Sequence, residues 1–251
     1  MYPTDLTETQ WQYIKKELML QDRKRKHDLR NVWNAIFYLV KTGCQWRMLP
    51  QDFPNWELVY YYFRKWCVLE EFDLLLGNLR STVRVNLDQN ACPSLGIMDS
   101  QSVRCGNNLA LNGVDGNKKI KGIKRHLVVD KNGFLIAVMV TVACIHDSKA
   151  AMLLMRVIKE LCSSVKTIMA DGGYRGELAK QIKNTFGYVL QVIISNYSKQ
   201  GFRPIRKRWV IERTFSWLDN NRRLTRNYET TFDAAEEMVK IAAIKILLNK
   251  I

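Results

Sequence analysis

The sequence predicts an α/β protein in which a mixed sheet is flanked by helices and preceded by an all-helical N-terminal domain. Three observations lead to this prediction. Apolar residues recur at helical spacing over roughly the first 85 residues, a polar segment follows at residues 85–94, and segments typical of strands and helices then alternate to the C-terminus. We therefore predict one domain at residues 1–90 and a second at residues 95–251.

The N-terminal part carries signals for the starts and ends of helices. Thr7 begins a capping-box pattern, and Gly43 is placed to end a second helix. A third helix is expected to open near Asn55 and to run through WELVYYYFRKW, which contains Arg64 and Lys65. This arrangement suits a helix-turn-helix DNA-binding module. It equally suits an ordinary helical bundle with tyrosines in its core.

The C-terminal part alternates between strands and helices. Lysine- and glycine-rich residues 104–125 are expected to form a loop, and the Lys-Asn-Gly segment at 131–133 is expected to turn a hairpin. The expected strands are 95–103, 126–130, 134–143, 166–173 and 189–194, and the expected helices are 149–161, 176–187, 207–224 and 232–248.

Composition excludes several classes of protein. A chain of 251 residues with 47% hydrophobic residues is neither disordered nor low in complexity. Its longest apolar stretch, 135–145, is interrupted by Thr141 and is too short for a membrane span of roughly 20 residues. No secretory signal is visible, and no two of the six cysteines have CxxC spacing. We therefore expect reduced thiols and a cytoplasmic location, at the bacterial nucleoid.

Positive charge points to a polyanionic partner. The net charge is +15, and residues 95–251 account for +13 of it, with 26 basic and 13 acidic residues. Residues 199–226 contain nine basic and two acidic residues. A second basic run has no acidic residue among its members, which are Lys118, Lys119, Lys121, Lys124 and Arg125. Nucleic acid is the leading candidate for the partner, although a basic protein without a specific partner would have the same composition.

Three acidic residues are candidates for chemistry. Asp99 and Asp171 each follow a short buried strand, where a carboxylate is commonly directed into a ligand-binding crevice. Glu212 lies on a helix one turn after Arg208, beside a stripe of core residues. Taken singly, each aspartate could be a turn or cap residue, and Glu212 could form an exposed ion pair. Taken together, the three could hold two Mg²⁺ or Mn²⁺ ions for phosphodiester displacement.

Several segments resemble the catalytic motifs of DDE transposases from bacterial insertion sequences, in particular insertion-sequence family five. They are GIMDSQSV, KKIKGIKRHLVVD, MADGGYRGE and RWVIERTFSWLDNNRRLTRNYE, and the N-terminal TGCQWRMLP and FPNWELVYYYFRKW are similar to the same family. The resemblance implies an RNase H-like catalytic domain with a Mg²⁺-dependent triad at Asp99, Asp171 and Glu212. It also implies cleavage at terminal inverted repeats, strand transfer into double-stranded target DNA, and a homodimer in the synaptic complex.

The sequence departs from this family at two positions. Related transposases carry a Tyr, Arg, Glu, Lys signature, in which Arg208 and Glu212 match, whereas Ile205 and Asp219 replace the Tyr and the Lys. Arg222 and Arg223, one turn further on, could substitute in contacting DNA. The residues expected to bind DNA are Arg64, Lys65, Lys118, Lys119, Lys121, Lys124, Arg125, Arg208, Arg213, Arg222 and Arg223.

Three functions are consistent with these features. The leading one is a transposase that binds the inverted repeats of an insertion sequence, cleaves DNA at its ends and transfers the strands. A catalytically inactive, sequence-specific DNA-binding regulator derived from a transposase is the alternative, and Asp219 is the residue that keeps it open. A two-metal nuclease without strand transfer is the third.

Overall fold

The structure is a computed structural model of the chain. It describes residues 1–21, 27–106, 112–174, 176–193 and 208–251, with only the backbone of Arg208. No helix within these ranges is long and apolar enough to cross a bilayer.

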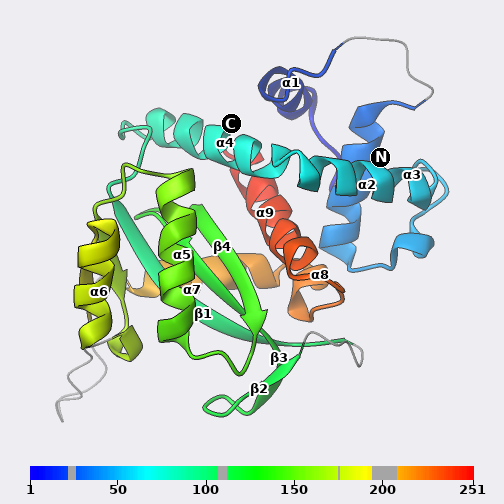
Figure 1. The fold of residues 1–251 in the computed structure, drawn as a ribbon. Coiled ribbons are helices and arrows are strands. Elements are labelled where there is room, and N and C mark those ends of the chain that lie inside the picture. Colours follow the sequence, from blue (N-terminus) through cyan, green and yellow to red (C-terminus); the bar gives the residue numbers. More distant parts are fainter. Residues whose placement is uncertain (22–26, 107–111, 175, 194–207) are drawn as a thin grey trace.

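Helices form the N-terminal part of the described chain, and strands alternate with helices after it (Figure 1). The N-terminal helices are α1 (Glu8–Glu17), α2 (Leu29–Thr42), the 3-10 helix η1 (Trp46–Met48), α3 (Trp56–Val68) and α4 (Glu71–Asn86). The strands are β1 (Leu95–Arg104), β2 (Gly113–Asp115), β3 (Ile120–Val129), β4 (Leu135–Val142), β5 (Thr167–Ala170) and β6 (Val189–Val192). The later helices are α5 (Asp147–Leu161), η2 (Gly172–Tyr174), α6 (Glu177–Phe186), α7 (Arg208–Asp219), α8 (Arg222–Thr225) and α9 (Phe232–Leu248).

These strands form one mixed sheet, as the alternation of elements predicts. Strand β1 pairs antiparallel with β3 and parallel with β5, and β3 also pairs with β4 and β2. The hairpin turn before Phe134 is confirmed, and Gly133 there has φ of 85°, which glycine adopts without strain. The expected loop at 104–125 is wrong in its last part. Strand β3 begins at Ile120 because its backbone groups are taken up by β1 and β2.

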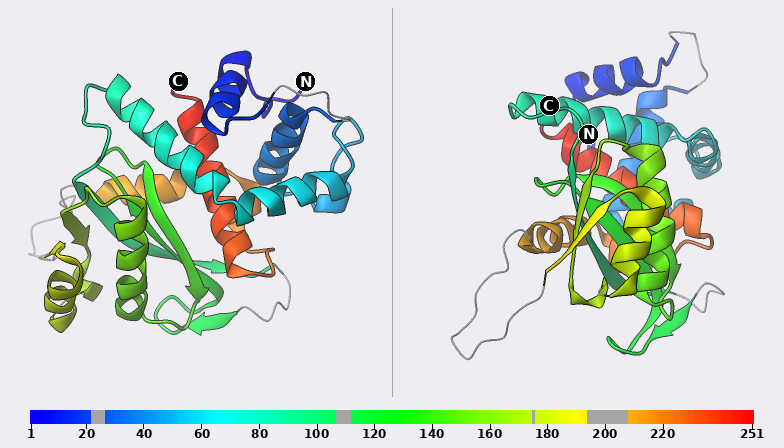
Figure 2. Two further views of the ribbon diagram at one scale, coloured as in Figure 1. Left: turned by 45° about the horizontal axis from the view of Figure 1, so that its top comes forward. Right: turned by 60° about the vertical axis from the view of Figure 1, so that its left-hand side comes forward.

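Alternation along the strands separates two hydrophobic cores. Ile97 and Leu127 lie in a core with residues of α7 and α9, whereas Met98 and Val128 lie in a core with residues of α5 and α6. Helices α5 and α6 therefore cover one face of the sheet, and α7 lies across the other (Figures 1 and 2).

Local signals in the N-terminal part form as expected. Thr7 caps α1 with the full capping box, Asn55 caps α3, and Gly43 ends α2 in the left-handed conformation. Helix α1 lies beside the end of α9, because the Gln10 side chain of α1 donates to the carbonyl of Leu248 over 3.0 Å (Figure 2).

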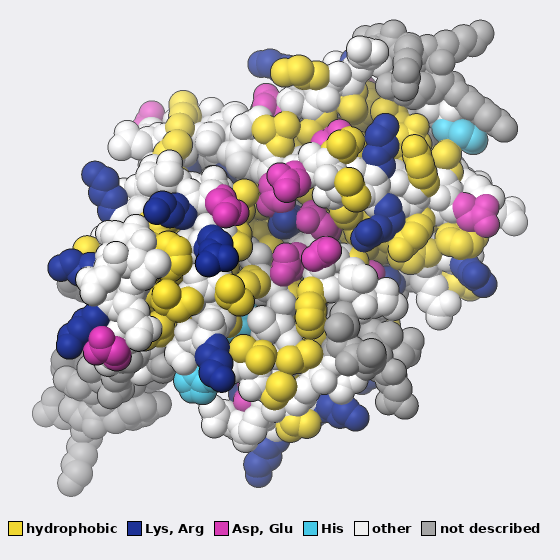
Figure 3. Space-filling view, in the orientation of Figure 1, with side chains coloured by type: hydrophobic (Ala, Val, Ile, Leu, Met, Phe, Trp, Pro, Cys, Tyr) yellow, Lys and Arg dark blue, Asp and Glu magenta, His cyan; other side chains and the backbone are white. Residues whose placement is uncertain are grey.

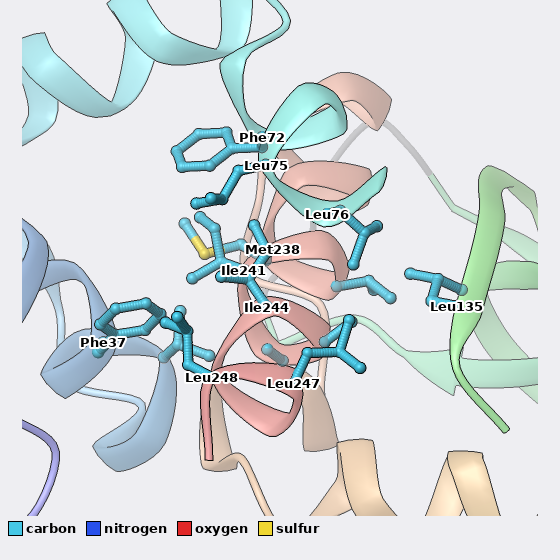
Figure 4. Close-up of a cluster of buried hydrophobic side chains, with 14 of the residues drawn as sticks. Phe37, Phe72, Leu75, Leu76, Leu135, Met238, Ile241, Ile244, Leu247 and Leu248 are labelled. Atoms are coloured by element: carbon cyan, nitrogen blue, oxygen red, sulfur yellow. The ribbon is translucent and has the colours of Figure 1, made fainter. Parts of the chain in front are cut away.

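One core joins the N-terminal helices to the C-terminal helix α9. Figure 4 shows Phe72, Leu75 and Leu76 of α4 packed on Met238 and Ile241 of α9. Further contacts in the same core come from Phe37 of α2, Leu135 of β4, and Ile244, Leu247 and Leu248 of α9. Helix α9 thus contributes to a core on the N-terminal side of the predicted boundary. A single Leu→Ala change in such a core costs about 2–5 kcal/mol.

Ion pairs fasten the same two helices on one face of the molecule. Acidic side chains gather there over α4 and α9 (Figure 3). Lys240 of α9 reaches Asp73 of α4 over 2.5 Å and Glu237 of its own helix over 2.8 Å. Lys240 and Glu237 are both nearly buried, so this pairing avoids the cost of an isolated buried charge.

Candidate active site

Asp99 and Asp171 lie on adjacent parallel strands at equivalent positions. The register pairs Ile97 of β1 with Met169 of β5, and each aspartate comes two residues later. Because side chains alternate along strands, both aspartates point to the same side of the sheet as this pair. Both line one small cavity, together with Ile193, which follows β6, and Ile211 of α7. The strand pairing therefore brings together two acids that are 72 residues apart in the chain.

Glu212 enters the same region on α7. Its neighbour Ile211 is completely buried and lines the cavity beside the two aspartates, whereas Glu212 itself is exposed. Asp219 is two helical turns further on and accepts from the Gln101 side chain of β1 over 3.2 and 3.3 Å. This contact fastens the face of α7 that carries Glu212 and Asp219 to the strand that carries Asp99.

The three acids supply the type of ligand that a hard divalent cation prefers. Carboxylate oxygens bind Mg²⁺ and Mn²⁺ in proteins, and on α7 Glu212 directly follows Ile211, which lines the cavity of Asp99 and Asp171. Within the described ranges, no three side chains of His, Cys, Asp or Glu form a ready-made metal cluster. The donor chemistry fits a divalent cation, and the metal ligands remain a prediction.

Tyr174 lies three residues after Asp171, at the end of η2. It is 2% exposed, and its backbone N–H donates to the carbonyl of Asp171 over 3.3 Å. Burial, followed by the charges of Asp147, Asp99 and Asp171, raises its pKa well above the usual value. Tyr174 therefore stays protonated beside the acids, and the sequence contained no clear signal for this burial.

Asp219 has a structural partner that sequence analysis could not identify. Arg125 of β3 is 1% exposed, and its guanidinium donates to the carbonyl of Leu224 over 2.7 Å. Burial lowers the pKa of Arg125 to about 10, and the charges of Asp219 and Glu229 act against this shift. An acid at position 219 thus compensates a buried cation, whereas a lysine there would repel it.

Basic residues 118–121 lie where DNA can reach them. Lys118, Lys119 and Lys121 are all exposed, and Lys118 Nζ donates to the carbonyl of Ser100 over 3.1 Å. Ser100 is next to Asp99, so this lysine places a positive charge close to the candidate site. An exposed lysine at this location is suited to neutralising a phosphate.

Lys124 and Arg125 lie inside the fold, which corrects their prediction as DNA contacts. Lys124 is 5% exposed and pairs with Asp147 over 3.2 Å and with Asp115 over 3.5 Å. The physical reason is the early start of β3, which carries both residues into the middle of the sheet between β1 and β4. Their charges are compensated by the protein itself.

The remaining predicted DNA contacts likewise include both structural residues and exposed residues. Arg223 is 6% exposed, bonds Glu229 over 2.7 Å and donates to the carbonyl of Cys44, so it too is a structural residue. Arg213 stacks between Trp209 and Trp217, with its guanidinium carbon 4.6 and 4.5 Å from the ring centroids. The exposed or partly exposed members are Arg64, Lys65 and Arg222. Ile205 and the side chain of Arg208 lie outside the described residues.

Comparison with known proteins places the chain among transposases. Residues 90–248 match the family described as "Transposase DDE domain", and residues 6–75 match the family described as "Putative transposase of IS4/5 family". The chain is 28% identical over 135 residues to a protein of Burkholderia cepacia named "Putative transposase for insertion sequence element IS402". That match covers 51% of this chain and 64% of the relative. With the DDE domain match, the mixed sheet flanked by helices is an RNase H-like fold.

Proposed function

Because this chain belongs to the DDE transposase family, we propose that it binds the terminal inverted repeats of an insertion sequence, cleaves DNA at the ends of that element and transfers the strands to target DNA. The observation that carries this proposal is the shared cavity of Asp99 and Asp171, which is also lined by Ile211, the neighbour of Glu212 on α7. The N-terminal region, residues 1–90, would bind the repeats, and residues 95–251 would carry out the chemistry. Two copies would act together as a homodimer in the synaptic complex.

In this proposal the chain's own residues position DNA and metal. Asp99, Asp171 and Glu212 supply carboxylate oxygens for Mg²⁺ or Mn²⁺. When bound, divalent ions stabilise the attacking and leaving oxygens of a phosphodiester displacement. The contact between Gln101 and Asp219 holds α7 against β1, and Lys118 near Ser100 neutralises a phosphate as it approaches.

The inactive regulator is less well supported than the enzyme. The sequence kept it open because Asp219 replaces a lysine of the family signature. In the structure Asp219 contacts Gln101 and lies near the buried Arg125, so this acid has a structural role in the fold. This role gives a reason for an acid at position 219 that does not require an inactive protein.

The test is single substitution of the three acids. Asp99→Asn, Asp171→Asn and Glu212→Gln remove a charge with little change in shape. We expect each to reduce metal-dependent cleavage of DNA ends by at least about 100-fold, because a metal ligand is lost. Glu160→Gln, at an exposed position of helix α5, is the matched control, and this variant should cleave DNA normally. Full cleavage by all three variants would refute the assignment.

Two further measurements complete the test. Binding of Mn²⁺ to the intact protein, followed by calorimetry, should weaken in the same three variants, which separates metal binding from catalysis. Joined DNA products should appear on a sequencing gel when target DNA is added. Cleavage without joined products would indicate a nuclease instead of a transposase.

A further inference from the structure

One cavity in the described part of the chain lies away from the candidate active site. It has a volume of about 420 Å³, within the usual range for ligand pockets. Its walls come from the N-terminal segment, α2, the end of α7 and the end of α9. It is therefore bordered both by helices of the N-terminal region and by the helix that carries Glu212.

Three lysines line this cavity, and none of its lining residues is acidic. Lys41 Nζ donates to the carbonyl of Asn220 over 2.9 Å, and Lys245 Nζ donates to Gln10 Oε1 over 3.2 Å and more distantly to a backbone carbonyl. Lys250 Nζ lies over the rings of Trp217 and Phe134, 5.9 and 5.8 Å from their centroids. Among the described residues, none of the three lysines has a carboxylate within 4 Å.

The lysines carry more positive charge than is needed to offset the negative C-terminal ends of the neighbouring helices. Lys41 lies in the last turn of α2 and Lys245 in the last turn of α9, where a cation offsets the negative helix end. Each helix end amounts to about half a charge, so three full charges exceed what the helix ends need. Each ammonium also has three N–H donors, and the described contacts use one on Lys41 and two on Lys245. The cavity thus offers positive charge and hydrogen-bond donors together.

We propose that this cavity binds a phosphate group. The Asn249 side chain adds a donor, because its Oδ1 accepts from Gln10 Nε2 over 3.1 Å and its NH₂ group is left for a ligand. A phosphate bound between Lys41 and Lys250 would connect α2 to α9 and to the end of α7. Binding would therefore hold the N-terminal helices against the helix that carries Glu212. The phosphate belongs either to a DNA backbone or to a free phosphorylated molecule, and the experiment distinguishes the two.

The test compares two double variants of the full chain. Lys41→Gln with Lys250→Gln removes two charges from the cavity, at positions exposed enough to leave the core intact. Lys159→Gln with Lys180→Gln removes two exposed charges from α5 and α6 and is the control. Both are studied without divalent metal, so a failure of the proposed cleavage reaction does not affect the result. The single variants at 41 and 250 serve if the first double variant does not fold.

Two probes separate the sources of phosphate. Inorganic tripolyphosphate should raise the Tm of the wild type and the control but leave the cavity variant unchanged if the site takes free phosphates. With a random-sequence duplex, the slope of log affinity against log salt should fall by about 2 in the cavity variant relative to the control if the site takes a DNA backbone. Either result supports the site. If the cavity variant matches the control with both probes, the proposal is overturned.

Discussion

The two faces of the β1–β3 strand pair use charged residues differently. On the face covered by α7, Asp99 lies at the cavity beside Asp171, and Gln101 and Arg125 hold α7 and α8 in place. On the face covered by α5, Ser102, Lys124 and His126 are buried in internal pairs. The side chains of adjacent residues in one strand therefore make contacts on opposite faces of the sheet. The comparison shows that a basic run in the sequence mixes structural cations with cations available to DNA.

The largest expected effect concerns Arg125 on the α7 face. Arg125→Met removes the bond to the Leu224 carbonyl and a buried cation that lies near Asp219 and Glu229. We expect the free energy of unfolding to fall by about 3 kcal/mol, measured by urea denaturation. Lys121→Met, at the exposed start of the same strand, should change it by less than about 0.5 kcal/mol. Equal losses in both variants would remove the distinction between buried and exposed cations.

A second effect concerns His126 on the α5 face. Burial lowers its pKa to about 4, the nearby Asp147 acting against this, and its Nε2 lies 3.0 Å from Thr141 Oγ1. The unfolded chain binds the proton more readily than the folded protein, so stability is complete above about pH 6.5 and is lost as the pH falls toward 4. The loss is about 3 kcal/mol.

Measurement of unfolding between pH 4 and 7 checks this prediction. His126→Gln should abolish the part of the pH dependence that this histidine causes. A variant with the same slope as the wild type would show that His126 is not buried in its neutral form.

A third prediction concerns Glu236, whose effect on stability changes with pH in the opposite direction to that of His126. Glu236 of α9 accepts from the backbone N–H of Val140 on β4 over 2.7 Å, and burial raises its pKa to about 7. The folded protein binds this proton more readily, so stability is complete below about pH 4.5 and is lost as the pH rises through 7. Glu236→Gln should flatten the pH dependence of the Tm in that range. A steeper dependence in the variant would contradict the raised pKa.

The smallest expected effect on stability belongs to the exposed lysines at the start of β3. Lys119→Gln with Lys121→Gln should leave the Tm unchanged and lower the salt slope of DNA binding by about 2, because two phosphate contacts are lost. Fluorescence anisotropy with duplex DNA measures this slope, and Lys159→Gln with Lys180→Gln provides the control for lost charge. An unchanged slope would exclude these lysines from the DNA contacts.

Much of the fold could be predicted from local patterns. The capping box at Thr7, the end of α2 at Gly43, the hairpin before Phe134 and the acids after two buried strands all depend on residues close together in the chain. The burial of Arg125 and Lys124 could not be predicted, because a charged residue is buried only when distant partners compensate it. Those partners come from β2, α5, the end of α7, α8 and the segment after α8.

The sequence by itself determined which segments become strands and helices, where the acids follow the strands, and to which family the chain belongs. These properties depend on backbone preference, alternation of apolar residues and short motifs, which act over a few residues. Only the tertiary structure decided which cations are buried, how α9 joins the N-terminal core, and that Lys41, Lys245 and Lys250 meet at one cavity. These contacts join residues far apart in the chain, and no local pattern specifies which side chains meet when helices and strands pack.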